Sequence, residues 1–300
     1  MALWVWVTLL AAISQSFRSA QQKNLKYRLG DFGASYVRFS YAVPFAWIGL
    51  LTYTYLFDAN LPLLNYKFLF WVTVAGVLQI IFTVLLVKLF SLRSFAAGTA
   101  FSKTEVLQAV FFEAIIIGVV VSIQVGLAIL LGVIAIILLS VAKGQVTLSN
   151  LLSSFFTKQA GLGLASGAFL ALCSVCFRAA TDALVGDDLI IKAGMTLGIS
   201  VVIQTVIMGL WMVKNARSEL IKSFKGWRGS IIVGFLGALT SFCWFYAFSS
   251  NAVAPVRAVG QIELVIALLI SIFFFREKPS WKEIVAISLL LISIVLVLLN

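Results

Sequence analysis

Long apolar runs separated by short polar breaks dominate this chain. A membrane-spanning helix needs about 20 mostly apolar residues, and ten segments of the sequence meet that requirement. The long polar break is Lys214 to Arg228, and Gly144–Thr157 has the pattern of a short amphipathic linker. The predicted spans cover roughly residues 3–24, 32–57, 66–90, 94–119, 123–142, 158–181, 189–213, 229–249, 252–275 and 280–299.

The composition agrees with a membrane protein. The chain is 62% hydrophobic and 11% charged, whereas soluble domains average roughly 45–50% and about 25%. A chain with this few charges cannot cover its surface with polar groups. We therefore predict an all-α polytopic membrane protein. The net charge of +11 resembles that of a nucleic-acid-binding protein, but the cations are scattered between apolar runs. Nucleic acid is therefore not an expected partner.

Some chemistries are excluded by residues that the sequence lacks. It has no histidine, which removes histidine bases, Ser-His-Asp and Cys-His nucleophiles and most zinc sites. Cys173 and Cys176 have the spacing of a redox or metal pair, but no second ligand pair exists. We therefore expect these two thiols and Cys243 to be buried packing residues. No secretory signal peptide and no nucleotide-binding glycine-lysine motif is apparent, and we expect no enzyme activity, metal or cofactor.

The loops between the predicted spans differ in charge. Fifteen cations lie in the odd-numbered loops, and only Lys67 and Lys192 lie in the even-numbered ones. The positive-inside rule then places the odd loops in the cytoplasm and both termini outside. The fifteen cations are Lys23, Lys26, Arg28, Lys88, Arg93, Lys143, Lys158, Lys214, Arg217, Lys222, Lys225, Arg228, Arg276, Lys278 and Lys282.

The two halves of the chain resemble each other. A shift of 160 residues aligns residues 10–20 with residues 170–180, with a serine, a phenylalanine and an arginine in register. A shift of 158 residues pairs Gly76 with Gly234 and Glu105 with Glu263. Five spans per copy is an odd number, so the copies must have opposite orientations. We predict inverted repeats over 1–143 and 158–300, joined by 144–157, which is typical of alternating-access transporters.

Nine charged residues fall within the predicted spans. Each would cost at least ~2.5–3.5 kcal/mol at a helix centre, so each needs a wet cavity or a partner. The five cations and four acids are Arg18, Arg38, Lys103, Arg178, Arg257, Glu105, Glu113, Asp182 and Glu263. We expect the substrate to bind among these charges.

Arg178 and Asp182 can pair because they are four residues apart on one helix face. The pair is either structural or part of the substrate site. The equivalent positions of the first copy are Arg18 and Gln22. Arg18 therefore needs a carboxylate on another helix or an anionic substrate group, unless its side chain extends to the membrane surface.

Two matching helix faces are candidates for the wall of a substrate cavity. Arg257 and Gln261 share a face of span nine, and their repeat counterparts Thr99 and Lys103 share a face of span four. At about 100° per residue, the carboxylates two residues further along each span point elsewhere. The faces that carry these cations and the faces that carry Glu105 and Glu263 should therefore not line one narrow cavity together.

The intramembrane glutamates have two alternative roles. Glu105, Glu113 and Glu263 either neutralise arginines on neighbouring helices or include the proton carrier of a coupled transporter. Among the aromatic residues of span eight, Tyr246 is the candidate to face the cavity.

Glycine positions indicate where helices pack closely, and proline positions indicate where spans are interrupted. Gly163-x-x-x-Gly167 and Gly194-x-x-x-Gly198 predict close helix approach, and Pro44 and Pro255 predict interruptions in spans two and nine.

The C-terminal motifs resemble the drug/metabolite transporter superfamily, specifically its ten-helix EamA-type permeases. The motifs that carry the resemblance are Tyr246-Ala247-Phe248-Ser249, Ala254-Pro255-Val256-Arg257, Ile262-Glu263-Leu264 and Phe275-Arg276-Glu277-Lys278-Pro279-Ser280. The chain departs from the family where Leu264 replaces a frequent proline and Arg276 a frequent glycine. Many relatives are also described with both termini in the cytoplasm, against the charge distribution here.

The resemblance implies secondary transport of small metabolites, commonly amino acids or related polar solutes, across the inner membrane of a bacterium. The excess of intramembrane arginine favours a substrate with an anionic group, so we expect an anionic or zwitterionic solute. Expected partners are this solute, membrane lipids and a coupling proton, with the chain acting as a monomer or homodimer. The alternative function is a flippase or assembly partner that acts on a lipid-linked polar head group.

Overall fold

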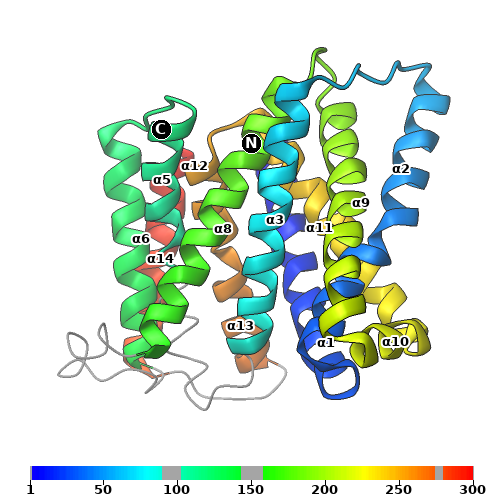
Figure 1. The fold of residues 1–300 in the computed structure, drawn as a ribbon. Helices are drawn as coiled ribbons and strands as arrows, with labels where there is room; N and C mark the ends of the chain where they lie inside the picture. The colour runs from blue at the N-terminus through cyan, green and yellow to red at the C-terminus, as the bar shows by residue number, and fades with distance from the viewer. Residues whose placement is uncertain (1, 90–102, 143–157, 274–279, 300) are drawn as a thin grey trace. The chain divides into compact units, whose positions relative to one another are not determined.

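The computed structural model describes residues 2–89, 103–142, 158–273 and 280–299, and this part of the chain contains helices and no strand (Figure 1). Each of the ten predicted spans contains at least one described helix, so the predicted all-α polytopic fold is confirmed. The helices are α1 (Leu3–Ser40), α2 (Ala42–Phe57), α3 (Tyr66–Leu89), α5 (Glu105–Ile116), α6 (Ile123–Ala142), α8 (Lys158–Ala183), α9 (Leu189–Asn215), α10 (Arg217–Lys225), α11 (Trp227–Ser250), α12 (Val253–Gly260), α13 (Ile262–Phe273) and α14 (Trp281–Leu298).

Five helices in the described part are long and apolar enough to cross a membrane without a break. They are Tyr66–Val87, Gly161–Ala183, Leu189–Asn215, Trp227–Ser250 and Trp281–Leu298. Ile123–Leu139 is a shorter apolar helix. The remaining predicted spans are kinked, divided between two helices, or lie partly outside the described residues.

The chain forms two compact units, each of which takes segments from both halves of the sequence. Unit 1 consists of Met1–Lys88 and Leu172–Asn251, and unit 2 consists of Leu89–Ala171 and Ala252–Asn300. The units therefore combine parts of both proposed repeats, whose boundaries stay a prediction. The proposed linker 144–157 lies outside the described residues.

A kink in α1 replaces the loop expected between spans one and two. Gly30 has φ +82°, a left-handed conformation that glycine adopts without steric cost. A Cβ atom at Gly30 would also overlap the Glu219 carboxyl group. Oε2 of Glu219 accepts hydrogen bonds from the backbone N–H groups of Phe32 (2.8 Å) and Gly33 (3.0 Å). Glu219 thus caps the helical segment that restarts after the kink.

Span two is interrupted at Tyr41, near Pro44, whereas span nine is interrupted at Gln261 and not at Pro255. α1 ends at Ser40 and α2 begins at Ala42, so Pro44 is the third residue of α2. Pro255 is likewise the third residue of α12. A proline is tolerated in the first turn of a helix, where N–H groups have no partner within the helix.

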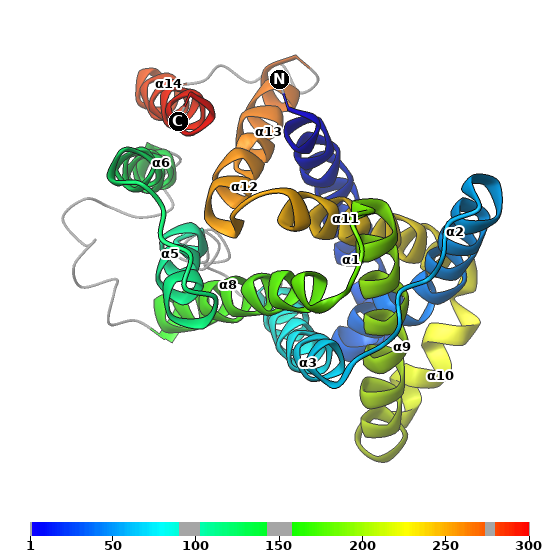
Figure 2. The same ribbon diagram turned by 90° about the horizontal axis from the view of Figure 1, so that it is seen from above.

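Small residues let α11 approach α1 closely in unit 1 (Figure 2). A Cβ atom on Gly234 would lie 2.5 Å from the backbone carbonyl carbon of Tyr41, and one on Gly237 would lie 2.9 Å from the carbonyl oxygen of Arg38. The Thr240 hydroxyl also donates to Ser14 Oγ at 2.9 Å. The α1–α11 contact is therefore a backbone-to-backbone interface that polar side chains cross.

The close helix approach predicted at Gly194 and Gly198 is confirmed. A Cβ atom on Gly194 would lie 2.9 Å from Leu50 of α2, and one on Gly198 would lie 3.2 Å from the Trp47 ring. These glycines let α2 pack against α9.

In unit 2, α6 and α14 lie side by side in both ribbon views (Figures 1 and 2). The Ser293 hydroxyl donates to the Ala128 carbonyl oxygen at 2.7 Å, and Ser293 Oγ lies 2.5 Å from where a Cβ atom of Gly132 would be.

Contacts within unit 1 agree with the charge pattern of the loops. Lys26 Nζ donates to the Val87 carbonyl oxygen at 2.8 Å, and Glu219 contacts the α1 kink, so loops one, three and seven share one side of unit 1. Asn65 Nδ2 donates to the Ala183 carbonyl oxygen at 2.6 Å, which joins two even-numbered loops. The structure supports the charge contrast, and the compartment on each side stays a prediction.

Candidate functional site

Two helices of unit 2 begin at matching breaks. α5 follows a turn at Lys103 and Thr104, and α13 follows a turn at Gln261. Thr104 has φ −67° and ψ −4°, and Gln261 has φ −65° and ψ −7°. The Gln261 N–H donates to the Ala258 carbonyl oxygen at 3.1 Å, three residues back, as in a 3₁₀ turn. Since Lys103 and Gln261 correspond under the 158-residue shift, the turns that precede α5 and α13 lie at equivalent positions of the two copies.

The two breaks bring charged side chains together. The Lys103 ammonium pairs with the Glu263 carboxylate, and the Gln261 amide donates to Glu105 Oε1 at 3.4 Å. The 158-residue shift pairs Lys103 with Gln261 and Glu105 with Glu263. The Lys103–Glu263 contact and the Gln261–Glu105 contact are therefore equivalent in the two copies. Arg257 Nη1 lies 3.9 Å from Glu105 Oε1 and adds a second ion pair. We call Lys103, Glu105, Arg257, Gln261 and Glu263 the paired-break cluster.

The paired-break cluster is enclosed by protein and balanced in formal charge. Glu105 is 3% exposed, Arg257 5% and Gln261 4%, and Lys103 and Glu263 are half-buried. Two cations face two carboxylates, which reduces the cost of holding them away from water. Attraction between charges is stronger in such a poorly hydrated setting than at a solvated surface.

One geometric expectation about these residues is wrong. Glu105 and Glu263 were expected to point away from the faces of Arg257, Gln261 and Lys103, yet all five side chains meet. A continuous helix would place about 100° between successive residues, whereas span nine breaks at Gln261 and the described part of span four begins with a turn at Lys103. Thr99, the remaining residue expected on these faces, lies outside the described residues.

Glu113 has a different surrounding from the other glutamates. Its carboxylate accepts hydrogen bonds from the backbone N–H groups of Val253 (2.8 Å) and Ala254 (3.2 Å), and its side chain is fully buried. The N-cap residue of α12 is Ala252, which has no side-chain acceptor. Glu113 therefore caps α12 from another helix, a contact that neither of its predicted roles includes.

Little space is present beside the cluster within unit 2. The cavity bordered by Gln261, Ala258 and residues of α6 and α14 has a volume of about 10 Å³. That is about the smallest space that can hold one water molecule. Binding of a metabolite within this cavity would therefore require its lining helices to move apart.

The predicted site residues of α1 belong to unit 1. Arg18 is 1% exposed, so its predicted extension to the membrane surface is wrong, because neighbouring helices enclose it. Gln22 Nε2 donates to the Ala34 carbonyl oxygen at 3.0 Å and joins the two segments of α1 across the kink. Arg38 Nη1 donates to the Thr83 hydroxyl at 2.8 Å and is also buried.

The remaining predicted residues also lie in unit 1. Arg178 Nε lies 3.6 Å from Asp182 Oδ2, which confirms their pairing on one helix face. The Asp182 side chain is 49% exposed, and Tyr246 is half-buried. The structure thus gathers five predicted residues in unit 2 and keeps Glu113 apart from them in α5 of the same unit. Six others are distributed over α1, α8 and α11 of unit 1: Arg18, Gln22, Arg38, Arg178, Asp182 and Tyr246.

The sequence-based search missed a buried amide pair in unit 1. Gln204 is fully buried, and its Nε2 donates to Gln79 Oε1 at 2.7 Å and to the Gly76 carbonyl oxygen at 3.3 Å. Gln79 and Thr83 lie on one face of α3, and Thr83 contacts Arg38. Their four-residue spacing within an apolar run was the signal that could have identified this polar face.

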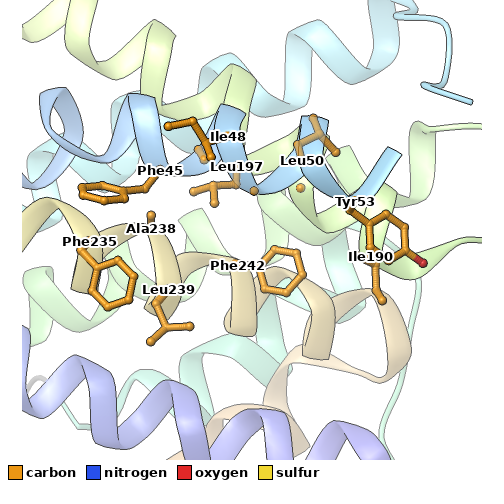
Figure 3. A pocket seen from close by; sticks show the side chains of 13 residues that line it. Phe45, Ile48, Leu50, Tyr53, Ile190, Leu197, Phe235, Ala238, Leu239 and Phe242 are labelled. Carbon is orange, nitrogen blue, oxygen red and sulfur yellow. The ribbon is translucent and has the colours of Figure 1, made fainter. Parts of the chain in front are cut away.

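Unit 1 also contains an apolar cavity of about 420 Å³ between α2, α9 and α11 (Figure 3). Figure 3 shows Phe45 and Phe235 at one end and Tyr53 at the other. The Tyr53 hydroxyl donates to Asp188 Oδ2 at 3.0 Å. The lining residue Ile48 is 63% exposed, so the cavity opens at the surface of the unit.

Comparison with known proteins identifies the second half of the chain. The model of the EamA-like transporter family matches residues 160–299. This part of the chain is therefore similar to the EamA-like transporters. This EamA-like half contributes Arg257, Gln261 and Glu263 to the paired-break cluster. The match agrees with the resemblance to the drug/metabolite transporter superfamily over these residues.

A solved structure supports the same fold over the whole chain. A crystal structure titled only "Crystal structure of protein" aligns with a TM-score of 0.65 and 14% identity, covering 98% of each chain. At that identity the likeness concerns the fold alone. No curated protein matches the sequence.

Proposed function

We propose that the protein is a secondary transporter of small polar metabolites, amino-acid-like or other anionic or zwitterionic solutes, that works by alternating access. The observation that carries this proposal is the paired-break cluster. Charges within membrane spans are costly and mark substrate or ion pathways. Transporters with internal repeats bind substrate where spans are discontinuous, and here the charges lie at the break in span nine and at the equivalent turn before α5.

The cluster offers groups for both ends of a zwitterion. Arg257 lies 3.9 Å from Glu105, which is ion-pair distance and too long for a hydrogen bond between these two atoms. A substrate carboxylate can compete with Glu105 for the planar guanidinium group, which binds carboxylates through two parallel hydrogen bonds. A substrate ammonium group has Glu105 and Glu263 as partners. We propose that Arg257 is the principal anion-binding residue and that Lys103 and Gln261 assist.

The same carboxylates are the candidates for proton coupling. When substrate displaces Glu105 from Arg257, the carboxylate loses its counterion and favours uptake of a proton. Glu113 fits this role less well, because its oxygens accept backbone hydrogen bonds at the start of α12. We propose Glu105 or Glu263 as the coupling residue, in an inner-membrane protein that acts as a monomer or homodimer.

The test is transport by the purified full chain in proteoliposomes. We expect uptake or counterflow of at least one solute from a panel of amino acids and organic acids, with accumulation when a pH gradient is imposed. Protein-free liposomes are the control. The proposal is wrong if no soluble solute moves and none competes for binding.

A second candidate function is movement of a lipid-linked polar head group, and the apolar cavity of Figure 3 favours it. A flippase needs a lateral opening between helices, and this cavity opens at the surface of unit 1. A Cβ atom on Gly49 in its wall would meet no atom within 4 Å, so Gly49→Leu fills the opening without a clash. Gly126→Leu in α6, also into open space, is the matched control. Solute transport should survive both changes, whereas lipid movement would be lost only in Gly49→Leu.

A further inference from the structure

The polar segment between α9 and α11 has a cationic and apolar surface. It contains the cations Lys214, Arg217, Lys222, Lys225 and Arg228, all exposed. Exposed apolar side chains alternate with them: Ile221 is 47% exposed, Phe224 56% and Trp227 51%. Glu219 is the only acid in residues 214–228.

The inward side of α10 is fixed to unit 1. The Glu219 carboxylate caps the restarted segment of α1, so the only acidic group of this segment is directed into the unit. The backbone carbonyl of Ser223, a residue with no exposed surface, accepts a hydrogen bond from the Tyr41 hydroxyl at 3.1 Å. Leu220 packs against the buried group that contains Tyr36 and Met212. The outward side therefore presents positive charge and apolar surface, with Asn215 and Ser218 as its exposed uncharged polar residues.

The position of α10 places this outward side at a membrane surface. α9 ends at Asn215 and α11 begins at Trp227, and both are long enough to cross a membrane. α10 connects them and lies across their ends (Figure 1). A helix in that position is at the level of the lipid head groups, where tryptophan is enriched and amphipathic helices insert their apolar side chains.

We infer that α10 and its flanking residues bind anionic lipid head groups. The ligand is a phosphate-bearing lipid of net negative charge, because five exposed cations face outward and no exposed acid in this segment opposes them. Ile221, Phe224 and Trp227 enter the acyl boundary while Arg217, Lys222 and Lys225 contact the phosphates. This site is independent of the proposed transport function, because it uses no residue of the paired-break cluster.

The experiment measures lipid binding by the full chain in a neutral detergent. Fluorescent phosphatidylglycerol and fluorescent phosphatidylcholine are titrated separately into the wild type and two variants. The test variant is Lys222→Gln with Lys225→Gln. The matched control is Lys67→Gln with Lys192→Gln, which removes the same charge from the first turns of α3 and α9 on the other side of unit 1.

The expected result is selective binding of phosphatidylglycerol that the test variant weakens. Each cation near an anionic lipid surface should contribute about fivefold, so the pair should cost roughly 25-fold in affinity. The control variant should bind like the wild type, and salt should weaken the wild-type affinity. Equal affinity for the two lipids, or equal weakening in both variants, would overturn the inference. So would self-association through this surface without preference for phosphatidylglycerol.

Discussion

Replacement of Glu113 by alanine should strongly destabilise unit 2. The Glu113 side chain is fully buried, and its two oxygens accept the Val253 and Ala254 N–H groups at 2.8 and 3.2 Å. Ala252 at the N-cap cannot accept them instead. In the alanine variant two buried N–H groups therefore lose their acceptor at the start of α12, the helix that carries Arg257.

The size of the effect follows from these two contacts. A hydrogen bond to a charged group contributes about 1.5–3 kcal/mol, so Glu113→Ala should cost about 3–5 kcal/mol of unfolding free energy after local relaxation. Glu113→Gln keeps one acceptor oxygen and should cost about 1–2 kcal/mol. Glu283→Ala is the matched control, because Glu283 accepts the Ser280 N–H at 2.7 Å in an exposed capping box. That exposed cap should contribute only about 1 kcal/mol.

The assay is thermal unfolding of the detergent-solubilised full chain, followed by tryptophan fluorescence, together with pH-driven uptake in proteoliposomes. At about 2–4 °C for each kcal/mol, Glu113→Ala should lower the Tm by roughly 10 °C and Glu283→Ala by a few degrees. The capping role would be refuted if Glu113→Ala unfolded at the wild-type temperature. Loss of pH-driven accumulation in a Glu113→Gln variant of unchanged stability would instead identify Glu113 as the proton carrier.

Two further predictions use residues related by the repeat. Gly234→Ala should lower the Tm, since its Cβ atom would press on the Tyr41 backbone and overpacking costs about 1–3 kcal/mol. A Cβ atom on Gly76 would lie 3.4 Å from the Gln204 side chain, which is an ordinary contact, so Gly76→Ala should leave the Tm nearly unchanged. Equal losses of Tm in the two variants would contradict the close packing of Gly234 on Tyr41. Lys103→Glu and Glu263→Lys should each reduce transport and lower the Tm, because each places like charges together. The double variant should recover transport and the wild-type Tm. If it recovers neither, the ion pair contributes to neither transport nor stability.

The apolar pattern of the sequence predicts most of the helices because burial in a membrane depends on local composition. Contacts within one helix are predictable for a similar reason, since helical geometry places Arg178 next to Asp182. The glycines Gly194 and Gly198 predict close approach because a missing side chain leaves room for a neighbour. Burial of Cys173, at 1% exposure, likewise follows from its apolar surroundings.

The arrangement of the cluster was not predictable from the sequence. Gln261 interrupts span nine at a position without proline, and this break changes which side chains share a face. The partners are also distant in the chain, because Lys103 and Glu263 are 160 residues apart. Glu113 and Val253 are 140 residues apart, so a capping role could not be inferred from either sequence neighbourhood.

The central claim is that Arg257 in the paired-break cluster binds the transported solute. The most direct measurement is counterflow of a labelled solute in proteoliposomes by Arg257→Ala, beside Arg257→Lys and the exposed-cation control Lys67→Ala. We predict that transport is lost in Arg257→Ala, is partly retained in Arg257→Lys with a raised KM, and is unchanged in Lys67→Ala at equal amounts of folded protein. Wild-type counterflow by Arg257→Ala would contradict the account.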